Sequence, residues 1–154
     1  MSVLEETFQI TQPMDAADYL YELLKVNGPS FGLENVEYNS RLIRQYPAAV
    51  VVPGRKDKIF RTTAFFEVIL EVVISVYHAR FNDSHRERTR DDLQLCTDIE
   101  ATIETGQLNI SGRVVVMYVS EIVPGLITRS KGEQVVGTRM NVTFMNRERM
   151  SKGA

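Results

Sequence analysis

The most regular hydrophobic pattern in the chain lies between residues 64 and 77, where every even-numbered position is apolar. The odd-numbered positions are mixed and include Glu67 and Glu71, which exclude a membrane-spanning segment. Apolar residues at every second position are typical of a strand with one buried face and one partly covered face. Valine and isoleucine dominate its second half and favour β-structure. The pattern predicts one long strand from Ile59 to Arg80.

Two other segments show the spacing of amphipathic helices. In residues 14–26, apolar residues recur at i, i+3, i+4 and i+7, with Pro13 at the start and Gly28 just past the end. The second helix is predicted over residues 84–105, because Ser84 and Glu87 form a capping box and Gly106 can end it. Its inner stripe is predicted to contain Leu93, Cys96, Ile99 and Ile103, with Leu95 beside them.

Further apolar runs predict the rest of a sheet. They comprise a weak strand near Val36, a short buried strand at Ala48–Val52, a strand at Gly112–Val123 and a last strand whose even residues face inward (Val136, Met140, Val142 and Phe144). Residues 55–58, Pro124-Gly125 and residues 128–134 are predicted as a charged turn, a turn and a polar loop. This order of elements predicts an α+β fold, with two helices packed on one face of a mostly antiparallel sheet.

The predicted long strand does not fit inside a domain of this size. From Ile59 to Arg80 it would reach roughly 70 Å at about 3.3 Å per residue, whereas a compact domain of this length is only about 40 Å across. The strand therefore either bends, with Thr62-Thr63 as the favoured place, or projects as an arm. Because projecting strands carry unpaired edges that pair with other chains, we expect Phe65 and Tyr77 to lie in a subunit interface.

Length and composition indicate one ordinary globular domain, residues 1–154, with a flexible N-terminal arm (1–12) and C-terminal tail (147–154). The chain has 154 residues, of which 44% are hydrophobic and 25% charged. Its net charge of −2 provides no general attraction to nucleic acid or to a membrane. The first residues lack the pattern of a signal peptide, and the single cysteine excludes an intramolecular disulfide and fits a reducing compartment.

No set of residues predicts a reaction. Glu67 and Glu71 would lie about 13 Å apart on a strand, too far for a carboxylate pair. His78, Asp83 and His85 are too few and too loosely spaced for a closed zinc site, and both histidines are expected near the surface. Cys96 is expected to be a buried, inert thiol without a histidine beside it. We therefore expect no catalytic residue, no cofactor site and no metal site, so the chain is not expected to be an enzyme.

Several stretches together resemble a known family. They are an amphipathic helix ending in Leu23-Leu24, the segment YPAAVVVPG, the strand AFFEVILEVVISVY, the helix RDDLQLCTDIEATI and the final RMNVTFMNRE. In this order and pattern the chain resembles the tail terminator (tail completion, or tail-to-head joining) proteins of long-tailed bacteriophages, over residues 15–147. The resemblance implies a structural virion protein that forms a hexameric ring on the tail tube, stops tube polymerisation and offers a surface for joining the head.

The resemblance also implies partners and a location. The partners would be other copies of the chain, the tail tube protein and a head-completion or connector protein, with neither a membrane nor a specific nucleic acid. The protein would be found in the virion tail, and in the host cytoplasm during assembly. We expect charged loops to meet neighbouring rings or the tube, through Arg55, Lys56, Lys58, Arg129 and Lys131. The alternatives are a head-to-tail connector, or a small ligand-binding or enzymatic α+β domain.

Overall fold

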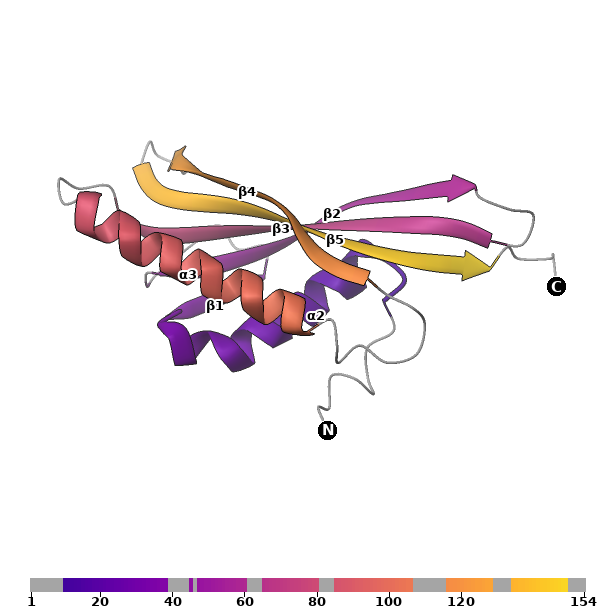
Figure 1. Cartoon of the computed structure of the whole chain (residues 1–154), viewed down its shortest axis with the longest axis horizontal. Helices are drawn as coiled ribbons and strands as arrows, with labels where there is room; N and C mark the ends of the chain where they lie inside the picture. The colour runs from indigo at the N-terminus through magenta and orange to yellow at the C-terminus, as the bar shows by residue number, and fades with distance from the viewer. Residues whose placement is uncertain are drawn as a thin grey trace.

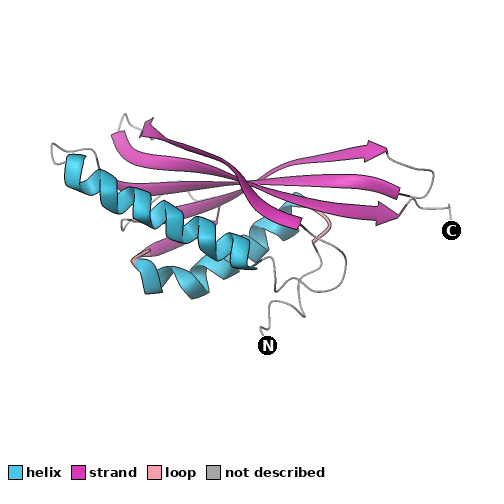
Figure 2. Cartoon of the chain, viewed as in Figure 1, coloured by secondary structure: helices cyan, strands magenta, loops and turns pink. Residues whose placement is uncertain are grey.

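The computed structural model describes residues 10–38, 45, 47–60, 65–80, 85–106, 116–128 and 134–149. Within these residues, two α-helices and a short 3-10 helix combine with five strands (Figures 1 and 2). In chain order they are α2 (Pro13–Asn27), η1 (Gly28–Phe31), β1 (Asn35–Tyr38), β2 (Ala48–Phe60), β3 (Phe65–Arg80), α3 (His85–Gly106), β4 (Val116–Thr128) and β5 (Gln134–Arg149). No helix in these ranges is long and apolar enough to cross a membrane.

The five strands form one sheet in the order β1-β2-β3-β5-β4. The short β1 is parallel to β2, and the other three pairings are antiparallel. Both helices lie on the same side of this sheet, below it in Figure 2. The predicted α+β fold, with two helices on a mostly antiparallel sheet, is confirmed.

The core lies between the helices and the even-numbered face of β3. The even positions from Val68 to Val76 are at most 2% exposed, as the alternating pattern predicts. They share one apolar cluster with Leu20 and Leu24 of α2 and with Ile99 and Ile103 of α3. The predicted inner stripe of α3 is wrong at one position, since Leu93 is 55% exposed and Leu95 takes the buried place.

The predicted single strand from Ile59 to Arg80 is in fact parts of two strands. β2 continues through the supposed turn at residues 55–58 to Phe60, and β3 starts at Phe65 and runs antiparallel to it. The continuation of β2 depends on a β-bulge between Pro53 and Lys56. A β-carbon at Gly54 would lie 2.7 Å from the backbone oxygen of Glu71, so only glycine fits this close approach without a shift.

The predicted turn at Pro124-Gly125 is also part of a strand. β4 does not turn there but remains paired with β5 through both residues. Proline is tolerated there because β4 is the last strand of the sheet, where a missing N–H removes no ladder bond on the outer side.

Residues 147–149, expected in a flexible tail, belong to β5 and pair with β3. At the other end Ile10 is buried, and its carbonyl accepts a 3.2 Å hydrogen bond from Asn146 Nδ2.

The far ends of three strands extend beyond the helices. Figure 1 shows the end of β2, the start of β3 and the end of β5 reaching to the right of both helices. We call this segment the distal ribbon and define it as residues 58–60, 65–67 and 147–149, which pair with one another or with the adjoining Val68. The 16 residues of β3 span about 50 Å at 3.3 Å each. The chain therefore both reverses between Phe60 and Phe65 and projects as a ribbon.

Candidate assembly surface and a buried histidine cluster

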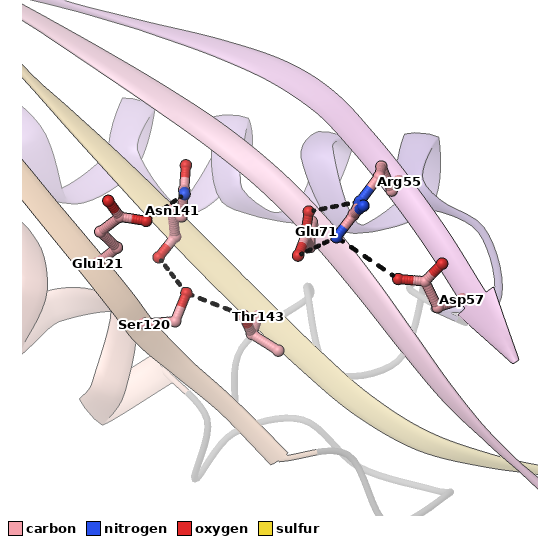
Figure 3. Close-up of polar contacts among 7 residues, drawn as sticks. All are labelled: Arg55, Asp57, Glu71, Ser120, Glu121, Asn141 and Thr143. Carbon is pink, nitrogen blue, oxygen red and sulfur yellow. Dashed lines mark hydrogen bonds and ion pairs between the residues drawn. The ribbon is translucent and has the colours of Figure 1, made fainter. Parts of the chain in front are cut away.

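The face of the sheet opposite the helices carries a charged network across β2 and β3 (Figure 3). At the β2 bulge, Arg55 Nε and Nη2 lie 3.3 and 3.4 Å from the two carboxylate oxygens of Glu71. Arg55 Nη2 is also 3.8 Å from an Asp57 carboxylate oxygen. These bonds to Glu71 raise the pKa of Arg55. Because the Arg55 side chain is 73% exposed, the network contributes charge to the surface rather than much stability.

A second polar network ties β4 to β5 on the same face, also drawn in Figure 3. Ser120 is the extra residue of a β-bulge between Val119 and Glu121. Its hydroxyl donates to the Asn141 carbonyl at 3.1 Å and accepts from Thr143 Oγ1 at 3.0 Å. The Asn141 amide donates to Glu121 Oε2 at 3.2 Å. The helix-free face is thus fixed in place by side-chain bonds between strands.

Apolar side chains interrupt these polar networks. Ile69, Val73 and Met145 are half-buried, and Tyr77 packs with Val52 against the buried Ala48 and Val50, in a small second core. Tyr77, predicted to be an exposed contact, is therefore half-buried and partly structural. The strands of this face also leave several apolar side chains of β4 exposed, namely Val116, Tyr118 and Val123.

The distal ribbon carries an aromatic pair, in which Phe60 is exposed and Phe66 is half-buried. The rings of Phe60 and Phe66 meet edge to face with centroids 6.2 Å apart, and Lys58 Nζ lies 5.3 Å from the Phe66 centroid. Phe60 is 60% exposed although it belongs to a paired strand. Phe65 begins β3 opposite Arg149, and its side chain lies outside the described residues. A projecting ribbon with an exposed aromatic side chain is typical of a contact with another protein.

The predicted interface residues divide into three groups. Arg55, Lys56 and Lys58 lie together on the part of β2 beyond Val51, although in a strand rather than in the predicted turn. Phe65 and Tyr77 stand at opposite ends of β3, so they do not form one patch. Arg129 and Lys131 lie outside the described residues, so their predicted role stays a prediction.

A buried polar cluster around His78 connects α3 to the sheet, and the sequence analysis missed it. His78 is the extra residue of a β-bulge between Tyr77 and Ala79, and it is 5% exposed rather than at the surface. Its Nε2 lies 2.8 Å from Thr138 Oγ1 and 3.8 Å from Cys96 Sγ. Its Nδ1 lies 3.4 Å from Asp92 Oδ1. The sequence contained a signal for the burial of His78, because this residue continues the even-numbered positions of β3, which face the core.

The cluster places a cysteine, a histidine and a carboxylate in the order found in thiol hydrolases. The pKa shifts of these groups oppose that chemistry, because burial lowers the pKa of His78 to about 4 and raises the pKa of Cys96. A nucleophilic cysteine needs the reverse shift, toward a thiolate beside an imidazolium. Cys96 is also only 4% exposed. These groups therefore favour a neutral, structural contact, although the expectation that no histidine lies beside Cys96 was wrong.

The remaining candidates for chemistry do not assemble into a site within the described ranges. Glu67 and Glu71 both belong to β3, and Glu71 is engaged by Arg55. Asp83 and the side chain of His85 lie outside the described residues. Among the residues that the structure describes, no three His, Cys, Asp or Glu side chains are grouped to hold a metal ion.

Comparison with known proteins adds no family. No model of a known protein family matches the chain, and a search of curated proteins finds no match.

Proposed function

We propose that this protein is a structural component of a bacteriophage tail. In this role it assembles into a ring, of six copies by the resemblance of its sequence, that caps the tail tube, stops its polymerisation and offers a surface for the head. The protein acts by binding neighbouring proteins, not as an enzyme. It takes part in assembly in the host cytoplasm and remains in the virion tail.

The observation that carries this proposal is the distal ribbon. Phe66 of the ribbon packs against the core, but the strands continue past the helices and Phe60 remains 60% exposed. Exposed aromatic side chains of this kind lose contact with water when a partner covers them, which favours association. The charged segment Arg55–Lys58 leads into the ribbon on β2 and would steer docking more than it adds affinity.

The buried cluster supports the same proposal against the enzymatic alternative. The one Cys–His–Asp grouping described is enclosed between α3 and the sheet, and its pKa shifts are opposite to those of an activated nucleophile. A head-to-tail connector would also be a ring and would use the same surfaces. It differs in where the ring sits, which a tail assembly experiment decides.

Complementation of a phage that lacks this gene tests the proposal. Without the protein, tail tubes are expected to grow past their normal length and to remain unjoined to heads. The wild-type gene should restore tails of uniform length, whereas Phe60→Asp should restore them poorly, because the charge is placed on the proposed contact.

The matched control is Val26→Asp, since Val26 is 69% exposed and belongs to α2, not to the distal ribbon. This variant should complement as well as the wild type. Tails of normal length in the absence of the gene would contradict the capping function. Normal tubes that fail only to join heads would favour the connector alternative.

A further inference from the structure

Two long strand edges of the described sheet pair with no other described strand. One is the outer side of β4, which ends the strand order. The other is the side of β2 away from β3 beyond Val51, because β1 pairs only with Ala48–Val51 and leaves β3 as the one described strand beside the next nine residues, 52–60. Such edges present rows of backbone N–H and C=O groups that can pair with another chain.

β4 is a long edge with little protection against pairing. It runs for 13 residues, and its only charged residue is Glu121. Four of its apolar side chains are between 38 and 47% exposed: Val116, Tyr118, Ile122 and Val123. Proteins usually protect such an edge with charged residues, proline, β-bulges or a short strand. The bulge at Ser120 and the proline at position 124 leave the segment from Val116 to Val119 regular.

The directions of the two edges decide what kind of pairing fits. β2 and β3, β3 and β5, and β5 and β4 are each antiparallel, so β4 runs opposite to β2. A neighbouring copy in the same orientation would therefore bring its β2 antiparallel to β4 and continue the alternation of the sheet. Contacts between two different surfaces of identical subunits repeat from copy to copy, and they close into a ring when the rotation permits.

The charges of the two edges favour this pairing over pairing of like edges. The open part of β2 carries three cations, Arg55, Lys56 and Lys58, and one anion, Asp57, whereas β4 carries the single carboxylate of Glu121. Two copies of β2 side by side would bring like charges together, which destabilises a strand pair. The β2–β4 contact avoids this repulsion, because the described β4 contains no lysine or arginine.

We propose that β4 of one copy pairs with the open edge of β2 of the next copy, so that one antiparallel sheet continues from subunit to subunit. This inference rests on the oligomeric part of the proposed function and adds the two surfaces that form the contact. It assigns Val116–Val123 and residues 52–60 as the complementary sides.

Cysteine cross-linking tests the pairing. Asp57 and Val116 lie at the same level of the sheet, opposite Ile69 and Met145 of the intervening strands, and both are on the helix-free face. With a flexible thiol cross-linker, Asp57→Cys and Val116→Cys should each give no dimer alone and should give dimers when mixed. The double variant should give a ladder up to the ring. Wild type, whose Cys96 is buried, serves as the background control.

A second pair of variants covers the case in which the cysteines perturb folding. Ile122→Lys on the edge should shift the oligomer to monomer in light scattering, while Leu93→Lys, at an exposed position of α3, should leave it unchanged.

Dimers of Val116→Cys alone would show pairing of β4 with itself and overturn the inference. An oligomer without a ladder, unaffected by Ile122→Lys, would also overturn it but leave the tail-capping function standing. A monomer under all conditions overturns the pairing, and capping is then judged by the phage complementation alone.

Discussion

Acidification should destabilise the fold through His78, and the structure gives the sign and an upper value of the effect. Burial lowers the pKa of His78 in the folded state to about 4, against about 6.5 when unfolded. The neutral imidazole is thus favoured by folding. The stability that it contributes is present above pH 6.5, and it is lost as the pH falls toward 4 because the unfolded chain takes up the proton first. Between pH 7 and pH 4.5 the loss is about 2 kcal/mol.

The carboxylate of Asp92, 3.4 Å from Nδ1, favours the imidazolium and makes this figure an upper value. Urea unfolding followed by circular dichroism at the two pH values measures the loss in wild type and in His78→Leu. The variant should be less stable at pH 7, because Thr138 loses its partner, but its further loss at pH 4.5 should be smaller by about 2 kcal/mol. The chain has only two histidines, so His85→Gln is the matched control. Equal pH dependence in wild type and His78→Leu would refute the assignment.

Other expectations follow from single positions. Gly54→Ala should cost about 1–3 kcal/mol in urea unfolding, because its β-carbon meets Glu71 backbone, whereas Gly125→Ala, with open space around it, should be near neutral. Ile99→Ala should cost about 2–5 kcal/mol and Leu93→Ala under about 0.5 kcal/mol, since only Ile99 is buried; equal costs would contradict the packing of α3. Cys96 should react with a thiol reagent only as fast as the native fold opens, and rapid labelling without denaturant would contradict its burial.

The periodic parts of the sequence predicted the fold well. The helix at Pro13–Asn27, the helix at His85–Gly106 and the buried even face of β3 follow from spacing, because a helix or strand that packs on one side must place its apolar residues at its own period. The errors concern the positions at which strands were predicted to end. Residues 55–58 and Pro124-Gly125 were predicted as turns, but a bulge at Pro53–Lys56 and an edge position keep both within strands.

The candidate sites were harder to predict because they depend on pairing between distant segments. His78 meets Cys96, Asp92 and Thr138 only when β3 has paired with β5 and α3 has packed on both. Local spacing carries no information on that contact beyond the parity of His78. The clustering of Arg55 and Lys58 was predicted from local charge, although in a turn and not on β2. Their position on an open sheet edge required the strand order, which no periodicity contains.

The most direct test of the account is to add the purified protein to polymerising tail tube subunits of the same phage and to measure tube lengths and ends by electron microscopy. A capping ring predicts that tubes stop lengthening as the protein is added and that one end of each tube carries an extra ring. Light scattering of the protein alone should approach six times the 17.5 kDa of the monomer if the ring forms before it binds. Tubes that keep lengthening at saturating protein, with bare ends, would contradict the proposed function.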